Sequence, residues 1–294
     1  MQKKLLLILN PRAGKTQSRS PLFDAVSVFS EAGYLVSVHN TSGRGDAAET
    51  AEKEGKNFDL VVCCGGDGTL NEAASGLMRL SEPPLLGYLP RGSTNDFASS
   101  LHISSNPVTA ARILMKARQQ PLDIGQWNDR YFVYVASFGA FTKSSYSAPQ
   151  AAKNALGHFA YILEGMKDLN TLRPYQIRLF ADGEDLSGDY LFGAVCNSTS
   201  IGGLMRLDPK HVVLNDGKFE LLLIPNPQSA IGLQNLILAI LNQQYDHEGV
   251  IFRHVSQLSL ETEQELPWSL DGEYAPSVPS AEIYNLQGAL TFLL

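Results

Sequence analysis

Apolar and polar positions alternate in blocks along the first part of the chain. Short, continuous apolar runs end in loops rich in Gly, Ser, Thr, Asn and Asp, and the loops lead into segments with helical spacing. Continuous apolar runs are typical of strands buried on both faces, and strands that alternate with helices predict a doubly wound parallel sheet. The expected strands are residues 4–9, 34–39, 58–64 and 85–89, and the expected helices are residues 21–33, a polar stretch ending near 56, a segment opening at 69, and 107–119.

From about Pro121 the pattern changes to β-rich runs with few helices between them, which predicts a second, largely antiparallel domain resembling a sandwich or a barrel. The β-rich runs are residues 131–138, 176–180, 190–196, 218–224 and 257–260, and helical insertions are expected at 150–169 and 228–243. The predicted fold class is therefore α/β plus mainly β. We place an α/β domain at residues 1–122 and a β-rich domain at residues 123–294.

Composition narrows the class of protein. A chain of 294 residues has room for two domains, and 44% hydrophobic with 18% charged residues describes a globular protein. The net charge of −7 argues against a nucleic-acid binder. The three cysteines show neither zinc spacing nor a disulfide framework, so a reducing cytoplasm is expected. The most apolar late segment, residues 231–241, falls far short of the roughly 20 residues that span a bilayer. We therefore expect a cytoplasmic protein, which could still work at a membrane surface.

One glycine-rich loop is the centre of the chemistry. The motif Gly65-Gly-Asp-Gly-Thr69 follows an apolar strand directly. Glycines allow backbone N–H groups to approach a ligand closely, and a helix N-terminus favours phosphate. Thr69 and Glu72 have the spacing of a capping box. Asp67 opposes phosphate charge unless a divalent cation is also present. The motif matches neither the Walker pattern nor the dinucleotide fingerprint, and a plain tight turn explains the same residues.

Three more polar loops follow predicted strands, at residues 10–15, 41–46 and 90–97. In open α/β sheets, ligands bind at the carboxyl ends of the strands, so all four loops could converge on one phosphate site. Lys15 and Arg91 are candidates for neutralising phosphate charge, although lone basic residues in loops are usually only solvated. Asn95 and Asp96 could support the nucleotide loop, face the acceptor, or simply cap a helix.

The chain resembles one family, the soluble bacterial diacylglycerol kinases and related lipid kinases with a diacylglycerol-kinase catalytic domain. The matching motifs are Asn10-Pro-Arg-Ala-Gly14, Gly65-Gly-Asp-Gly-Thr69 with Asn71-Glu72, Pro90-x-Gly92-x-Thr94-Asn95-Asp96-Phe97, Asn215-Asp-Gly-Lys218 and Trp268-Ser-Leu-Asp-Gly-Glu273. Segments 137–142 and 197–203 also look familial. The resemblance covers nearly the whole chain, and the combination is specific, although Gly-Gly-Asp-Gly alone is shared with NAD kinases and phosphofructokinases.

The resemblance implies two domains with ATP between them and a lipid hydroxyl entering the same cleft. The N-terminal domain would be the ATP-binding domain and the C-terminal domain the lipid-substrate and metal-binding domain. A Mg²⁺ ion would travel with the ATP phosphates. Longer relatives add a terminal segment that packs on the first domain, and the sequence leaves open whether this chain has one. The residues expected to contact ATP are Asn10, Pro11, Arg12, Ala13, Gly14, Thr41, Gly65, Gly66, Asp67, Gly68, Thr69, Asn71, Glu72 and Thr94.

The family match places the catalytic acid at Asp271, which would be the base for the acceptor hydroxyl. An Asp-Gly pair is also a common hairpin turn, so that alternative stays open. The resemblance further implies a structural Mg²⁺ bound by the Asp216 carboxylate and by backbone carbonyls such as those of Val213 and Lys218. Mixed carboxylate and carbonyl ligands suit a hard cation, but a hairpin turn between two strands explains the same residues.

The leading hypothesis is an ATP-dependent lipid kinase that phosphorylates diacylglycerol to phosphatidic acid in phospholipid metabolism. The acceptor could instead be phosphatidylglycerol, a sphingoid-like lipid or a polyprenol. The alternatives are an NAD kinase-like enzyme and a non-catalytic nucleotide-binding regulator. A membrane lipid substrate implies transient peripheral contact with the inner face of the membrane, for which the basic and apolar helix expected at 150–169 is a candidate; core packing is its default interpretation. A homodimer is compatible with the sequence.

Overall fold

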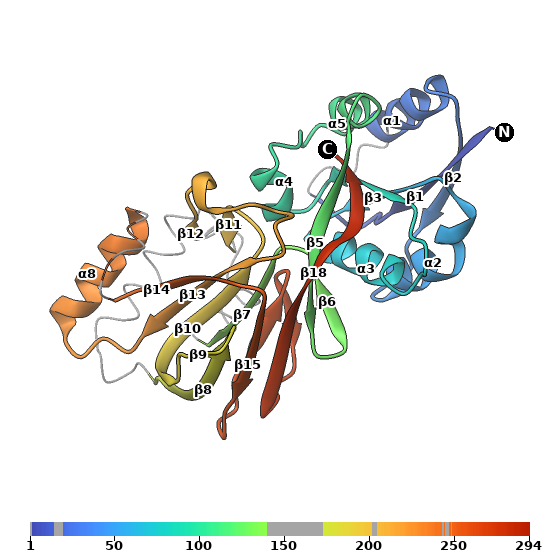
Figure 1. Cartoon of the computed structure of the whole chain (residues 1–294). Helices are drawn as coiled ribbons and strands as arrows, with labels where there is room; N and C mark the ends of the chain where they lie inside the picture. The colour runs from blue at the N-terminus through green and yellow to red at the C-terminus, as the bar shows by residue number, and fades with distance from the viewer. Residues whose placement is uncertain are drawn as a thin grey trace. The chain divides into compact units, whose positions relative to one another are not determined.

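The computed structural model describes residues 2–14, 20–139, 173–201, 205–242, 244, 247 and 249–294. The chain divides into two compact units (Figure 1). Unit 1 consists of Met1–Ile124 together with Gln287–Leu294, and unit 2 consists of Gly125–Leu286. Among the described residues, no helix is both long and apolar enough to cross a membrane.

Unit 1 contains the predicted parallel sheet. Its first four strands are β1 (Lys3–Leu9), β2 (Tyr34–Asn40), β3 (Leu60–Gly65) and β4 (Leu85–Pro90), all parallel and in the order β4-β3-β1-β2. Every residue of β3 is buried, as its continuous apolar run predicts. The strand order reverses between β1 and β3. Strand β2 follows β1 on one side of it, and β3 and β4 are then added on the other side of β1.

Helices cover both faces of this sheet (Figure 1). On one face, α1 (Ser20–Glu31) packs against α5 (Pro107–Leu114). On the other face, α2 (Asp46–Glu54) and the short helix η1 (Gly55–Asn57) lie with α3 (Asp67–Leu77). A short helix, α4 (Asp96–Ser100), follows β4. Unit 1 is thus a doubly wound α/β fold, as predicted.

Two sequence expectations within unit 1 are wrong. The helix expected to open at Thr69 begins at Asp67 with Gly66 as its N-cap, so Thr69 and Glu72 form no capping box. Their side chains instead contact other loops, as described below. The helix expected at 107–119 ends at Leu114, because Gln119 already belongs to strand β5 (Gln119–Trp127). Asn106 caps its start by accepting N–H bonds from Val108 and Thr109.

The end of the chain belongs to unit 1. The last strand, β18 (Ser280–Leu293), pairs in parallel with β4 through Phe292 and Leu86. Arg118 and Leu294 exchange two backbone hydrogen bonds, each 3.0 Å long. The fully buried Asp123 carboxylate accepts the Gly288 N–H at 2.8 Å. Residues 287–294 therefore pack on the first unit.

Unit 2 is the expected antiparallel β domain. All its described strand pairs are antiparallel, and its core cluster includes Trp127, Phe132, Phe138, Phe219 and Trp268. Helix α8 (Ala230–Leu241) is the second predicted insertion, whereas the helix expected at 150–169 lies outside the described residues. Its strands and remaining short helix are β6 (Arg130–Phe132), β7 (Val135–Gly139), β8 (Tyr175–Ala181), β9 (Glu184–Asp185), β10 (Gly188–Cys196), β11 (Ser200–Ile201), β12 (Met205–Arg206), η4 (Pro209–His211), β13 (Phe219–Pro225), β14 (Ile251–Val255), β15 (Gln257–Glu261), β16 (Trp268–Leu270) and β17 (Glu273–Ala275).

Candidate functional site

The loops that carry the candidate ATP contacts lie at one edge of the sheet in unit 1. Because β1 to β4 are parallel, their carboxyl ends meet at the same edge. The loops after β1 and β3 flank the point where the strand order reverses. In doubly wound folds, this reversal point is where ligands bind. The four polar loops therefore lie, as expected, at the edge of the sheet where doubly wound folds bind ligands.

Asn10 ties the loops on either side of the reversal point together. Its backbone N–H donates to the Cys64 carbonyl at 2.9 Å, and its side-chain Nδ2 donates to the Thr69 hydroxyl at 3.0 Å. Its Oδ1 accepts the Arg12 N–H at 2.9 Å. One side chain thus fixes the turn after β1 and its distance from the first turn of α3. Thr69, expected to cap the helix, serves instead as the partner of Asn10.

The loops after β3 and β4 touch through two glycines. A Cβ atom added to Gly92 would lie 2.7 Å from the Gly66 Cα and 2.6 Å from Asn95 Oδ1. Asn95 accepts the Gly92 N–H at 2.7 Å and donates to the Gly92 carbonyl at 2.9 Å. The buried Tyr88 hydroxyl donates to the Gly65 carbonyl at 3.3 Å. This close approach leaves no space for a side chain at Gly92, and a Cβ added to Gly66 would lie only 3.1 Å from the Gly92 Cα, which is a physical reason for glycine at both positions.

Asp67 has a positioning role in the same region. Its Oδ2 accepts the backbone N–H of Asp96 at 3.1 Å, which anchors the first residue of α4. Asp67 is also the first residue of α3, where the helix dipole favours a negative charge. The charge that looked out of place in a phosphate loop is therefore stabilised by a backbone donor and by a helix N-terminus.

The loop at residues 41–45 is held by both neighbouring strands and by α3. The Thr41 N–H donates to the Leu9 carbonyl at 2.9 Å, at the end of β1. The Gly45 N–H donates to Glu72 Oε1 at 2.8 Å. Glu72 is an expected ATP contact, and in the structure its carboxylate holds the loop that carries Thr41. Its carboxylate connects two of the candidate nucleotide loops.

Replacing Glu72 by Ala is expected to raise the KM for ATP about five- to tenfold with little change in kcat. The variant removes the acceptor that holds Gly45, and a charge-assisted hydrogen bond contributes about 1–1.5 kcal/mol in this setting. Glu72→Gln retains an acceptor oxygen and should keep most of the affinity. Steady-state kinetics with varied ATP test this, with the exposed Glu54→Ala in α2 as the control. An unchanged KM in Glu72→Ala would contradict the role of this contact.

Asp46 organises the same loop from its other end, a role that no sequence motif predicted. Its carboxylate accepts the Ser42 hydroxyl and the Ser42 N–H, each at 2.6 Å, and lies 2.9 Å from His39 Nε2. Thr50 donates to the same carboxylate at 3.2 Å. The Ser42 hydroxyl, followed by the Ser42 N–H and His39, holds the pKa of Asp46 well below its ordinary value of 3.8. The available signal was an Asp placed directly after a Gly at a helix start.

This lowered pKa predicts an acid-dependent stability term. A carboxylate whose folded pKa is depressed stabilises the fold above its unfolded pKa of 3.8, and that stabilisation is lost as the pH falls further toward the folded pKa. Asp46→Asn should lower the free energy of unfolding by about 1–2 kcal/mol at pH 5. The difference from wild type should shrink between pH 4 and pH 2.5. Urea unfolding across this range is the measurement, and a constant difference would refute the assignment.

Asp271 lies in unit 2, in the turn between β16 and β17. Asp271 and Gly272 have φ values of +49° and +81°, the pattern of a type I′ hairpin, so the turn interpretation is confirmed. The side chain is only 2% exposed. It accepts three backbone N–H bonds, from Val133 at 2.6 Å, Tyr134 at 2.9 Å and Val135 at 3.0 Å. These donors stabilise its negative charge and fix its position. Its role as a base stays a prediction.

The predicted metal ligands also lie in unit 2, in the turn before β13. Val213, Asp216 and Lys218 are all exposed, and Asp216 Oδ1 accepts the Lys218 N–H at 3.0 Å. Strand β13 follows this turn, but no described strand immediately precedes it, so the expected hairpin between two strands is wrong. The local bond explains Asp216 without a metal. Its Oδ2 and the neighbouring carbonyls are compatible with Mg²⁺, so the metal set stays a prediction.

The remaining candidates divide by position. Pro11, Arg12 and Ala13 lie in the turn after β1, Gly68 and Asn71 lie in α3, and the exposed Thr94 lies in the turn after β4. The structure therefore brings the predicted ATP contacts to one edge of unit 1 and places Asp271 and the predicted metal ligands in unit 2. Lys15, residues 140–142 of segment 137–142, and residues 202–203 of segment 197–203 lie outside the described residues.

Two family models match the chain in succession. Residues 4–127 match the diacylglycerol kinase catalytic domain, and residues 135–293 match the YegS C-terminal NAD kinase beta sandwich-like domain. The chain belongs to the diacylglycerol kinase catalytic domain family. This family member is therefore a kinase of the lipid-kinase class, which confirms the resemblance inferred from its motifs.

Known proteins support this assignment over the full length. The diacylglycerol kinase of Bacillus subtilis strain 168 is 34% identical to this family member over 97% of this chain and 94% of that protein. The diacylglycerol kinase of Staphylococcus aureus strain bovine RF122 is 32% identical over 98% and 91%. A crystal structure of a diacylglycerol kinase from Bacillus anthracis strain Sterne has a TM-score of 0.82 at 24% identity, covering 99% of this chain and 97% of that one. This structural likeness supports the two-part fold.

Proposed function

We propose that this kinase transfers the γ-phosphate of ATP to the hydroxyl of diacylglycerol, giving phosphatidic acid. The observation that carries the proposal is the Asn10 to Thr69 hydrogen bond at the reversal point of the sheet. It joins a glycine-rich turn and a helix N-terminus, the two elements that bind phosphate in doubly wound folds. We take diacylglycerol as the acceptor because the relatives with 32–34% identity are named diacylglycerol kinases.

In this proposal, the residues of unit 1 act by positioning. The first N–H groups of α3 and the glycine backbone at 65–66 would bind phosphate oxygens. Asn10, Glu72 and Asp67 hold the surrounding loops in place through the bonds described above. Mg²⁺ bound to ATP would supply neutralisation of phosphate charge. Fixed donors aimed at phosphate are the main way in which proteins accelerate phosphoryl transfer.

Asp271 is the proposed base in unit 2. Its carboxylate is held in a fixed position by three N–H donors, and a fixed acceptor suits a group that takes a proton from a hydroxyl. A structural Mg²⁺ at Val213, Asp216 and Lys218 belongs to the same proposal. We also propose that the protein is cytoplasmic, that it binds transiently to the inner face of the membrane, and that it assembles as a homodimer. The membrane binding follows from the lipid substrate, because that substrate resides in the bilayer.

The test is transfer of labelled γ-phosphate from ATP with Mg²⁺ to a panel of micellar lipids, with NAD as a soluble acceptor. Labelled phosphatidic acid is the expected product. Label on phosphatidylglycerol, a sphingoid lipid or a polyprenol would retain the mechanism and replace the acceptor. Label on NAD would overturn the lipid assignment. ATP binding without transfer to any acceptor would favour a regulatory protein instead.

A further inference from the structure

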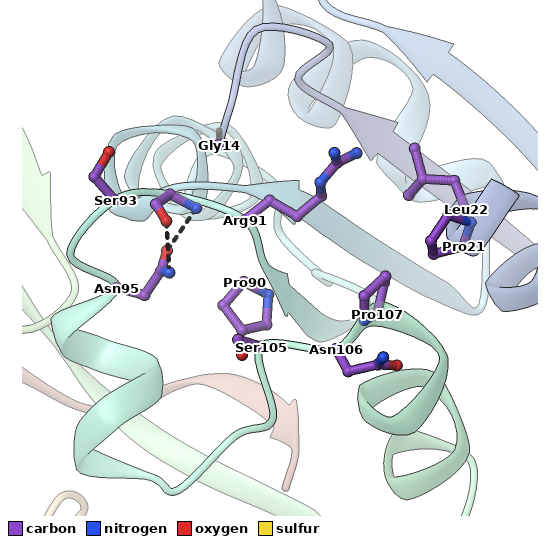
Figure 2. Close-up of a pocket in the computed structure, with 11 residues that line it drawn as sticks. Gly14, Pro21, Leu22, Pro90, Arg91, Ser93, Asn95, Ser105, Asn106 and Pro107 are labelled. Atoms are coloured by element: carbon purple, nitrogen blue, oxygen red, sulfur yellow. Dashed lines mark hydrogen bonds between the residues drawn. The ribbon is translucent and has the colours of Figure 1, made fainter. Parts of the chain in front are cut away.

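The pocket of unit 1 in Figure 2 belongs to the candidate nucleotide site, because Gly14 and the loop after β4 line it. In unit 2, the proposed groups lie on separate turns. Asp271 is in the turn between β16 and β17, and the predicted metal ligands are in the turn at residues 213–218. If both turns take part in one reaction, their positions must be fixed relative to each other.

Strand β10 lies between β7 and β13 in the sheet of unit 2 (Figure 1). Its last residue, Cys196, is opposite Val135 of β7 on one side and Glu220 of β13 on the other. Val135 is one of the N–H donors to Asp271, and the turn at residues 213–218 leads directly into β13. The register of the sheet therefore places the residue that follows β10 between the two turns.

Asn197 occupies this position and is only 2% exposed. Residues 190–196 of β10 are all buried, so a polar residue that continues them needs partners inside the protein. The Asn197 backbone N–H donates to the Tyr134 carbonyl at 2.8 Å, and its Nδ2 donates to the Leu214 carbonyl at 3.3 Å. One buried residue thus contacts the segment before β7 and the turn before β13.

Each of these two contacts leads to a proposed site residue. The Tyr134 N–H donates to Asp271 Oδ1 at 2.9 Å, so the backbone of Tyr134 joins Asn197 to the proposed base. Leu214 directly follows Val213 and precedes Asp216 by two positions, so it lies within the predicted metal set. Its carbonyl is not one of the carbonyls in that set. A bond to the Leu214 carbonyl therefore fixes the turn without using a predicted ligand.

We propose that Asn197 is a positioning residue that holds the turn at residues 213–218 in place relative to Asp271. The proposal rests on the proposed kinase function, in which this turn binds Mg²⁺ and Asp271 is the base. Phosphoryl transfer depends on fixed positions of the groups that take part, so a displaced turn lowers the rate. Asparagine suits the position because its carboxamide donates a hydrogen bond without adding a charge.

The first test is the kinetics of Asn197→Leu, which keeps the branch at Cγ but has no donor for the Leu214 carbonyl. A carbonyl that loses its donor favours contact with water, so the exposed turn should move outward. We expect kcat to fall about tenfold or more. The KM for ATP should stay near its wild-type value, because the predicted ATP contacts lie in unit 1. Asn197→Gln keeps a carboxamide donor and should recover part of kcat.

The second test needs no phosphate transfer. Binding of Mn²⁺, as a probe for Mg²⁺, is measured by electron paramagnetic resonance on the full chain without nucleotide. Asp216→Asn identifies the part of the signal that comes from the turn. Asn197→Leu should weaken this part about tenfold, because residues that orient metal ligands contribute to metal affinity. Asn197→Gln should restore part of the binding.

Ser198→Ala is the matched control. Ser198 is the next residue and is fully buried, and its hydroxyl donates to the Ser200 carbonyl at 2.9 Å within the same loop. This variant should keep kcat and Mn²⁺ binding near their wild-type values. Urea unfolding first establishes that each variant is folded. Asn197→Ser, whose hydroxyl is too short to replace Nδ2, takes the place of Asn197→Leu if the latter does not fold.

Three results would overturn the proposal. They are an unchanged kcat in the folded Asn197→Leu variant, equal Mn²⁺ binding by this variant and wild type, and no Asp216-dependent Mn²⁺ binding in wild type. A different result would refute the lipid kinase: a wild-type protein that transfers no phosphate. Mn²⁺ binding that still depends on Asn197 in that protein would support Asn197 as the residue that positions the turn.

Discussion

Asp271→Asn is expected to lower the free energy of unfolding by about 2–4 kcal/mol. The carboxylate accepts three backbone N–H groups while only 2% exposed. An Asn side chain has one acceptor oxygen, so its amino group must face a backbone N–H, either that of Val133 or those of Tyr134 and Val135. A buried donor left without an acceptor costs about 1–3 kcal/mol, and bonds to a charged acceptor are also lost. The left-handed backbone at φ +49° suits Asn, so the turn itself adds little strain.

Asp182 provides a matched control in the same unit. It also precedes a glycine in a hairpin turn, with φ +47°, and its carboxylate accepts the Ser256 N–H, the Ser256 hydroxyl and the Gln257 N–H. Burial raises its pKa and the Ser256 and Gln257 donors lower it, with a net lowering. Asp182 is exposed, so water replaces lost partners, and Asp182→Asn should cost about 1 kcal/mol or less. Urea unfolding compares the two, and equal losses would contradict the argument from burial.

The same variant bears on catalysis, because Asp271→Asn is also the natural test of the proposed base. Removal of a general base lowers rates about 10²–10⁴-fold. Activity must therefore be measured at a temperature and urea concentration where the variant is shown to be folded. If the folded variant retains wild-type kcat, Asp271 has the structural role alone. If kcat falls in the folded variant while ATP still binds, the base assignment is supported.

Gly92→Ala is expected to raise the KM for ATP at least tenfold and to lower kcat. The added Cβ would lie 2.6 Å from Asn95 Oδ1 and 2.7 Å from the Gly66 Cα. Neither neighbour can yield easily, because Asn95 is bonded twice to Gly92 and Gly66 caps α3. Overpacking of this kind costs about 1–3 kcal/mol, and 1.4 kcal/mol corresponds to a tenfold change in affinity. The loops after β3 and β4 must separate, which displaces the proposed phosphate-binding amides.

Gly43→Ala is the control for this variant. Gly43 lies in the loop at residues 41–45, and an added Cβ would have nothing within 4 Å. It should leave both kinetic parameters near their wild-type values. Titration of an ATP analogue and steady-state kinetics provide the comparison. Equal effects of the two substitutions would show that loop flexibility, and not the contact between Gly66 and Gly92, governs nucleotide binding.

The periodicity of the sequence determined much of the fold. The continuous apolar run that forms β3 is buried at every residue, because a strand covered on both faces needs no polar side. Polar loops after β1, β2, β3 and β4 converge at one edge, since parallel strands place their carboxyl ends together. The change to β-rich runs after Pro121 marked the antiparallel domain correctly. These features depend on residues that are close together in the sequence, so the spacing of apolar and polar residues is enough to predict them.

The tertiary structure decided which partners the candidate site residues contact. Asn10 contacts Thr69, Glu72 contacts Gly45, and Asp271 contacts residues 133–135, and these partners are brought together by strand order and register. The capping box failed for this reason: Gly66 already caps α3, so Thr69 and Glu72 are available for bonds across loops. The last strand likewise joins β4 through a pairing that no local pattern predicts. Side-chain type and spacing are local properties, whereas the partner that satisfies a buried polar group is chosen by the whole fold.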